Sequence, residues 1–266
     1  MIKNILSIAG SDPSGGAGIQ ADLKTISALG GYGMSVITCL TAQNTQGVTA
    51  VHVPPINFLE AQIRSLRSDI DIAAIKIGML ANAEIIECVA RLLSDVEIPI
   101  ILDPVMVATS GDRLLDSDAV DVLISQLVPL ATVLTPNLHE SAALLGTTKA
   151  TTKDQMRTQA YELMKFGSTW VYLKGGHLEG TLSPDLITDG NQSNWLDTTR
   201  IKSQNTHGTG CTLSSAIATL MGQGEDPMSA AEKAKAYISG AILASDQLCV
   251  GKGSGPVHHF HRPFNP

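Results

Sequence analysis

The segment from Asn205 to Thr212, Asn-Thr-His-Gly-Thr-Gly-Cys-Thr, has the composition of an anion-binding turn. Gly208 and Gly210 stand just before residues 213–221, whose apolar spacing predicts a helix. The unpaired N–H groups and the dipole of such a helix start favour a phosphate. Cys211 lies at this helix start, where the pKa of a thiol tends to fall, so it is a candidate base. The alternative is a common Gly-x-Gly turn with a small buried cysteine.

Three further polar residues stand where predicted strands end, the edge at which open α/β sheets bind ligands. Lys174, beside two glycines, can reach a phosphate, although a lysine there is usually only solvated. Asp103 suits a metal or a phosphate-bound water, or it accepts a hydrogen bond from a loop. Gln43 offers an amide donor and an acceptor side by side, or is a turn residue.

Asn137 and Glu140 are three residues apart and begin a predicted helix, so both project from one face. An amide oxygen and a carboxylate suit Mg²⁺, which keeps several waters and is shared with substrate phosphates. The alternative is purely structural: an N-cap asparagine with a glutamate at the third helical position forms a capping box.

These residues need a sheet and helices to bring them together. The alternation of apolar runs with glycine-containing loops predicts strands at 3–9, 34–41, 48–53, 72–77, 99–107, 131–135 and 170–173, and an antiparallel pair at 182–189 and 193–198. Helical spacing predicts helices at 19–29, 56–68, 83–93, 118–128, 213–221 and 228–248. The loop 10–18 follows the first strand, but it lacks the Gly-Lys-Ser/Thr ending of a Walker A sequence and a clean Gly-x-Gly-x-x-Gly pattern.

The bulk composition limits the classes of protein to consider. The 266 residues are 44% hydrophobic but only 4% aromatic, which favours helices packed on a buried sheet, in one domain spanning 1–266. A net charge of −7 argues against nucleic-acid or anionic-membrane binding. Four cysteines without a Cys-x-x-Cys pair, no signal-peptide core and no run of spanning length indicate a soluble cytoplasmic protein. The histidines at 258, 259 and 261 lack acid or cysteine partners at ligand spacing, which favours a structural tail.

Taken together, these segments resemble the hydroxymethylpyrimidine/phosphomethylpyrimidine kinases of thiamine biosynthesis. The resemblance spans nearly the whole chain and is carried by residues 10–22, 41–45, 76–79, 103–106, 135–140, 174–177, 207–211 and 255–260. It implies a ribokinase-like fold, which is a mostly parallel, doubly wound sheet flanked by helices, with a small antiparallel edge. It also implies two ATP- and Mg²⁺-dependent steps: phosphorylation of 4-amino-5-hydroxymethyl-2-methylpyrimidine, and then of its monophosphate to the diphosphate.

The resemblance also implies roles for individual residues. The pyrimidine pocket would be formed by Gly10, Asp22, Gln43, Met79 and Val107. ATP would contact Asn137, Thr209 and Lys174, with Glu140 and Asp103 at the metal. The amides from Gly208 through Gly210 to Cys211 would form the anion hole, and Cys211 would take the place of the aspartate base of sugar kinases.

Two alternatives remain open. A pyridoxine/pyridoxal kinase of the same fold would carry the same Gly-Thr-Gly-Cys turn, and a non-catalytic pyrimidine-binding regulator would need the transfer groups to be broken, yet they are present. A sugar kinase is disfavoured by Cys211 and by the lack of a long insertion after the first strand. By analogy with relatives, we expect a homo-oligomer.

Overall fold

The computed structural model describes residues 1–106 and 119–261 and contains an eight-stranded sheet with the order β10-β9-β8-β7-β6-β5-β1-β2. Every neighbouring pair in the part of the sheet that runs from β8 through β7, β6, β5 and β1 to β2 is parallel. The last two pairs, β8 with β9 and β9 with β10, are antiparallel. The strands are β1 (Asn4–Ala9), β2 (Tyr32–Ile37), β5 (Ala74–Ile77), β6 (Ile100–Leu102), β7 (Val133–Leu134), β8 (Trp170–Lys174), β9 (Leu182–Thr188) and β10 (Ser193–Thr199). This is the mostly parallel sheet with an antiparallel edge that the sequence predicted.

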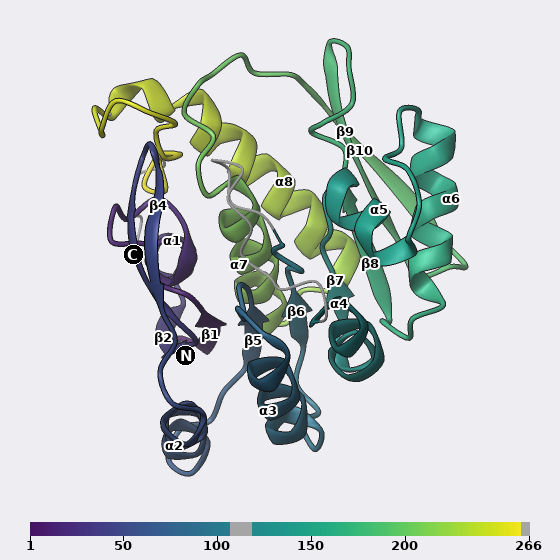
Figure 1. Ribbon diagram of the computed structural model, residues 1–266. Helices are drawn as coiled ribbons and strands as arrows, with labels where there is room; N and C mark the ends of the chain where they lie inside the picture. Colours follow the sequence, from purple (N-terminus) through teal and green to yellow (C-terminus); the bar gives the residue numbers. More distant parts are fainter. Residues whose placement is uncertain (107–118, 262–266) are drawn as a thin grey trace.

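Helices cover both faces of this sheet (Figure 1). One face packs against α2 (Ile56–Arg67), α3 (Ala83–Leu93), α4 (Ala119–Val122), α5 (Leu138–Leu145) and α6 (Lys153–Met164). The other packs against α1 (Gly18–Ala28), α7 (Thr209–Gly222) and α8 (Pro227–Leu243). Because both faces are covered, the parallel strands are mostly apolar, and β5 is fully buried although it contains Lys76.

The predicted strand 34–41 is interrupted in the structure. β2 ends at Ile37, and a separate hairpin follows, with β3 (Leu40–Asn44) antiparallel to β4 (Gly47–His52). This hairpin forms its own two-stranded sheet and stands apart from the main one (Figure 1). Gln43 therefore lies on the hairpin and not at the end of a central strand.

Two other expectations need correction, and one helix was not predicted. The predicted helix 118–128 contains only a short α-helical part and continues as a π-helical turn at Leu123–Leu127 and a 3-10 turn at Val128–Leu130, which contains a proline. The predicted strand 99–107 ends at Leu102. Helix α6 was not predicted, because Met156, Gln159, Ala160 and Leu163 are its only buried residues and the apolar stripe is short.

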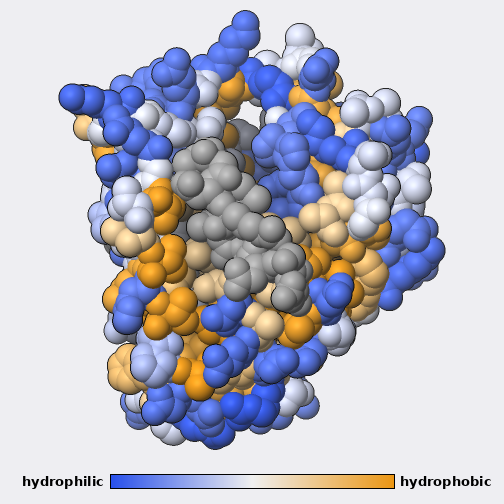
Figure 2. Space-filling model, viewed as in Figure 1, coloured by the Kyte–Doolittle hydropathy of each residue, from blue (hydrophilic) through white to orange (hydrophobic). Residues whose placement is uncertain are grey.

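The face shown in Figure 2 carries hydrophilic residues along its top, right and bottom edges, and apolar residues gather at its left and also to the right of the grey segment. Figure 1 places β2, β4 and α2 on the left side, and their exposed apolar residues include Tyr32, Val51 and Phe58. Within the described residues, no helix combines the length and the hydrophobicity needed to cross a membrane.

Candidate active site

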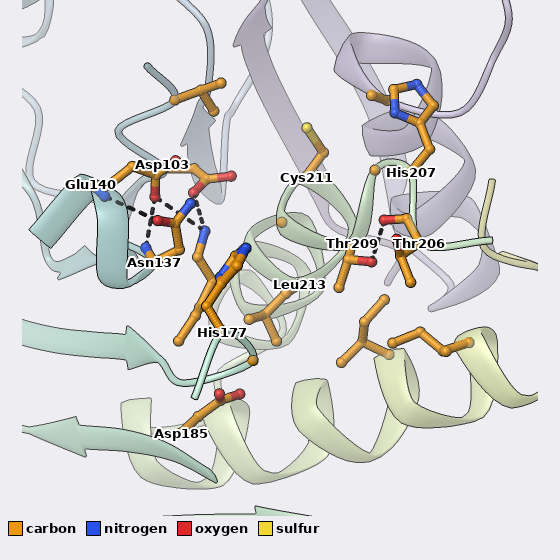
Figure 3. A pocket seen from close by; sticks show the side chains of 18 of the residues that line it. Asp103, Asn137, Glu140, His177, Asp185, Thr206, His207, Thr209, Cys211 and Leu213 are labelled. Carbon is orange, nitrogen blue, oxygen red and sulfur yellow. Dashed lines mark hydrogen bonds and ion pairs between the residues drawn. The ribbon is translucent and has the colours of Figure 1, made fainter. Parts of the chain in front are cut away.

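A cavity of about 660 Å³ lies at the carboxyl edge of the parallel strands. Its lining comes from the segments after β1, β5, β6, β7 and β8, and from the turn that begins α7. Figure 3 shows Asp103, Asn137 and Glu140 on one side of this cavity and Thr206, Thr209 and Cys211 on the other. The sheet therefore gathers side chains that are as much as 200 residues apart in the sequence at the edge where such folds bind ligands.

The turn before α7 is fixed by a close approach of two backbones. Gly208 caps the helix with φ 78°, and a Cβ atom at this position would lie 1.7 Å from the carbonyl oxygen of Gly16. Only glycine fits both requirements. The turn therefore brings the first N–H groups of α7, which have no partner within the helix, to the cavity wall.

Gly210, the second glycine of this turn, lies against the charged centre of the cavity. A Cβ atom there would lie 3.3 Å from both Asp103 Oδ2 and Lys174 Nζ. Lys174 Nζ donates to Asp103 Oδ1 at 2.7 Å and lies 3.7 Å from Glu140 Oε2. Burial lowers the pKa of Lys174, but the two carboxylates raise it more, so the ammonium stays charged beside the helix start.

Asp103 is almost fully buried, 1% exposed, and is held by hydroxyl groups from both sides. Thr135 Oγ1 donates to Asp103 Oδ1 at 3.2 Å, and Ser214 Oγ donates to Oδ2 at 3.3 Å. The structural role considered for Asp103, acceptance of hydrogen bonds, is therefore confirmed. The same carboxylate also lines the cavity.

Asn137 and Glu140 form the capping box of α5. The Asn137 side chain accepts from the N–H groups of His139 and Glu140, while Glu140 Oε2 accepts from Asn137 N at 2.7 Å. Burial raises the pKa of Glu140 to about 7, with Asp103 adding to the shift and Lys174 opposing it. The capping alternative is confirmed, and both residues also line the cavity.

The carboxylates of the cavity suit a metal ion that takes most of its ligands from water and from the substrate. No cluster of three or more metal-ligating side chains occurs in residues 1–106 and 119–261. Asp103 and Glu140 are instead two carboxylates joined through Lys174. This set fits Mg²⁺ shared with phosphates, because Mg²⁺ is usually bound through one or two carboxylates and keeps several waters.

The expectation of a lowered pKa at Cys211 is wrong. Burial raises the pKa of this thiol to about 11, and the negative charges of Asp22 and Asp103 add to the shift. Lys76 and the N–H of Gly18 act in the opposite direction but are outweighed. Desolvation therefore exceeds the effect of the helix start, and Cys211 is a neutral thiol at pH 7 in the ligand-free protein.

Asp22 also differs from its expected role. It is completely buried, is not part of the cavity lining, and pairs with Lys76, whose Nζ lies 2.9 Å from each of its oxygens. The hydroxyls of Ser7 and Ser215 donate to the same carboxylate. Asp22 therefore holds a buried ion pair beneath the cavity. The isolated lysine in the apolar strand 72–77 was the sequence signal for this pair, because a buried charge requires a partner.

Three of the remaining residues expected at the pyrimidine lie in the same cavity as Cys211. Gly10, Gln43 and Met79 contribute to the lining, whereas Val107 lies outside the described residues. A Cβ atom on Gly10 would meet Cys39 Sγ at 2.7 Å, so the chain passes close to the hairpin here.

Sequence reasoning did not identify the pair formed by Asp12 and His207. His207 Nε2 lies 2.7 Å from Asp12 Oδ2, and both residues are buried. Asp12 also accepts from the N–H groups of Ser14, Gly16 and Ala17, so it organises the glycine-rich loop. Burial raises the pKa of Asp12, but the His207 contact and these hydrogen bonds lower it to about 2.

The far arm of the cavity runs between β10 and α8 and is partly apolar. Leu213, Ile238 and Ile242 line it, together with residues 198–201. At the bottom of this arm, Asp185 accepts hydrogen bonds from Lys235 Nζ and from Tyr172 Oη. This arm has the apolar surface that a planar base requires, and it joins the charged centre at Lys174.

Two solved kinases share this architecture. An ADP complex of Bacillus subtilis pyridoxal kinase is 33% identical with a TM-score of 0.89, and 97% of this chain and 98% of that chain are covered. A phosphomethylpyrimidine kinase from Clostridium difficile 630 is 41% identical with a TM-score of 0.80, and 90% and 99% are covered. The fold and the site therefore define a kinase of the ribokinase-like class.

The sequence comparisons narrow this class. The family model described as phosphomethylpyrimidine kinase matches residues 12–258. Hydroxymethylpyrimidine/phosphomethylpyrimidine kinases from Rhizobium meliloti and Escherichia coli are 52% and 49% identical, and each alignment covers 97% of both chains. The chain belongs to the phosphomethylpyrimidine kinase family.

Proposed function

We propose that this chain is a single catalytic unit that transfers the γ-phosphoryl group of ATP first to the hydroxymethyl group of an aminopyrimidine and then to the resulting monophosphate. One observation carries the proposal. Lys174 and the start of α7 meet in a cavity that has Gln43 and Met79 at one end and an apolar arm at the other. Such a cavity has room for a pyrimidine and a nucleotide whose phosphates meet at the charged centre.

Each group then has a defined task in the transfer. Lys174 and the N–H groups of Thr209, Gly210 and Cys211 offset the charge that develops on the phosphoryl oxygens. Asn137 supports Glu140, and Glu140 with Asp103 would hold Mg²⁺, which would offset further negative charge of the phosphates. Gln43 would read the aminopyrimidine edge through its amide, with Gly10 and Met79 packing on the ring.

Proton transfer differs between the two steps. In the first step the attacking alcohol must lose a proton, whereas in the second the attacking phosphate is already an anion, with a second pKa near 6. A neutral Cys211 thiol cannot accept that proton in the ligand-free state. A base role for Cys211 therefore requires that the charges of bound Mg²⁺ and Lys174 lower its pKa in the complex.

Product analysis tests the function directly. The protein is incubated with MgATP and the aminopyrimidine alcohol, and the mono- and diphosphates are quantified by mass spectrometry. We expect both products in sequence. A protein that binds the pyrimidine but consumes no ATP would instead be the non-catalytic regulator.

The Cys211→Ala variant separates the two steps. If Cys211 is the base, the first rate falls by about 10²- to 10⁴-fold and the second changes far less. Equal losses in both steps would indicate that Cys211 only packs. Both rates are measured on the same preparation, starting from the alcohol and from the monophosphate.

Pyridoxal phosphorylation is the second candidate function. A Staphylococcus aureus pyridoxal kinase, solved with AMP-PCP and pyridoxal, is 34% identical with a TM-score of 0.89 and covers 98% of this chain. Competing turnover of pyridoxal and the aminopyrimidine in one reaction decides between them, and we expect the aminopyrimidine to be used preferentially.

A further inference from the structure

Hydrogen bonds attach the β3–β4 hairpin to other described residues at its base and at its tip. At its base, Thr41 Oγ1 donates to the carbonyl of Ser11 at 2.8 Å. At its tip, between the strands, Thr45 contacts the C-terminal segment. A two-stranded hairpin is marginally stable on its own, and most of this one is exposed. Gln43 lies between these two attachments, so both contribute to its position.

The contact at the tip is dense and specific. Thr45 Oγ1 accepts from the N–H groups of Lys252 and Gly253 at 3.2 and 3.1 Å, and the Thr45 carbonyl accepts from Ser254 N at 2.9 Å. A Cβ atom on Gly253 would lie 2.0 Å from that carbonyl oxygen. Figure 1 shows the yellow C-terminal segment beside the tip of the hairpin. The glycines of this segment thus permit a backbone approach that a larger residue would prevent.

The same segment continues to the anion-binding turn. The N–H of His207 donates to the carbonyl of Gly255 at 3.0 Å, and His207 forms a β-bridge with Pro256. The His207 ring in turn contacts Asp12. Residues 252–257 therefore join the hairpin that carries Gln43 to the turn that carries Gly208 and Cys211. A smaller cavity of about 360 Å³, lined by all three segments, lies between them.

We propose that residues 252–257 are a strap that sets the position of Gln43 relative to the phosphoryl-binding turn, and that Thr45 is a positioning residue for the pyrimidine. Thr45 does not line the main cavity, so it acts only through the hairpin and the strap. The inference rests on the proposed function for its kinetic part. Because Thr45 contacts the strap at its hairpin end, loss of its hydroxyl should affect pyrimidine binding more than ATP binding.

Thr45→Val tests the strap, because it keeps the β-branched shape and removes the acceptor of two N–H groups. We expect the KM for the aminopyrimidine to rise by about five- to tenfold, with kcat and the KM for ATP within about twofold. Thr45→Ser restores the hydroxyl and should return the KM to near the wild-type value. Thr49→Val is the matched control, since the Thr49 hydroxyl donates to Ala42 within the hairpin and not to the strap.

Amide hydrogen exchange of the ligand-free protein gives a readout that does not depend on catalysis. In Thr45→Val, residues 252–257 and the hairpin tip should exchange faster than in wild type, whereas Thr49→Val should leave residues 252–257 unchanged. An unchanged pyrimidine KM, or equal effects of Thr45→Val and Thr49→Val, would overturn the strap. Failure of the wild type to phosphorylate the aminopyrimidine would overturn the proposed function, and the exchange result alone would then decide whether the strap exists.

Discussion

Cys211 illustrates how the surroundings of a single residue outweigh its local position. A cysteine at a helix start is expected to be acidic, yet burial and two nearby carboxylates raise the pKa of this thiol to about 11. Lys76 lowers the pKa but is itself bound to Asp22, which limits the net positive charge near the sulfur. The chemistry of the site therefore depends on the charge that ligands bring.

The reactivity of Cys211 provides a direct check. In the ligand-free protein, we expect its alkylation by iodoacetamide to accelerate about tenfold per pH unit between pH 7 and pH 10, since only the thiolate reacts. Peptide mass spectrometry measures the rate at each cysteine, and the exposed Cys249 controls for the reagent. A rate that levels off near pH 8 would contradict the raised pKa.

At the scale of the elements, the end of β8 is positioned by close packing against β9. A Cβ atom on Gly175 would lie 1.9 Å from the carbonyl oxygen of Pro184, and Gly175 N donates to Asp185 Oδ1 at 2.8 Å. Lys174, the residue that pairs with Asp103, immediately precedes this contact. The strand pair and not a flexible loop thus fixes the direction of the Lys174 side chain.

Gly175→Ala should therefore damage both the fold and the site. We expect a loss of about 1–3 kcal/mol in the free energy of unfolding, because the strands must separate to admit the methyl group. Displacement of Lys174 should lower kcat/KM by about tenfold or more. Urea denaturation and steady-state kinetics measure the two effects.

Gly176→Ala is the control for this variant. Its Cβ atom would meet only Ser183 Oγ at 3.8 Å, an ordinary contact, so its stability should stay within about 0.5 kcal/mol of wild type. Equal losses of stability in the two variants would show that the β8–β9 contact is not the cause.

At the scale of the whole molecule, segments from the first 20 residues and from residues 252–259 meet near the site. The loop after β1, the turn before α7 and the segment 252–259 are joined through Asp12, His207 and His259. His259 lies under α7 and α8: its Nε2 is 3.1 Å from Thr212 Oγ1, and its carbonyl accepts from Tyr237 Oη at 2.6 Å. The histidine-rich tail is therefore structural, as the sequence indicated.

Burial of His259 predicts a pH dependence of stability. Burial lowers the pKa of His259 from 6.5 to about 3, with smaller effects from Lys24, His258 and His261. Since the folded state favours the neutral ring, this contribution is present above pH 6.5 and is lost as the pH falls from 6.5 towards 3. The free energy of unfolding should decrease there with a slope of up to about 1.4 kcal/mol per pH unit from this residue.

The difference between variants isolates this contribution. His259→Gln should show a smaller slope than wild type in urea denaturation between pH 6.5 and pH 4, whereas His52→Gln, at the exposed end of β4, should keep the wild-type slope. Parallel curves for wild type and His259→Gln would rule out His259 as the source.

The sequence by itself determined most of the strands and helices in their order, and the charged residues and the glycine turn of the cavity lining. Apolar runs must be buried, and the residues that follow parallel strands must meet at one edge, so the sequence predicted Asp103, Asn137 and Lys174 at the site. The sequence also predicted the turn at Gly208, because its glycines stand just before an apolar helical pattern. Periodicity could not show the break between β2 and β3, because both segments read as strand.

Only the tertiary structure decided the protonation and the pairing of these residues. Asp22 is one turn into a helix in the sequence, but its depth below the cavity and its partner Lys76 depend on how α1 packs on the sheet. The pKa of Cys211 depends on desolvation and on charges from three other elements, and the strap depends on contacts more than 200 residues apart. Such interactions are set by distances through space, which the spacing of residues along the chain does not specify.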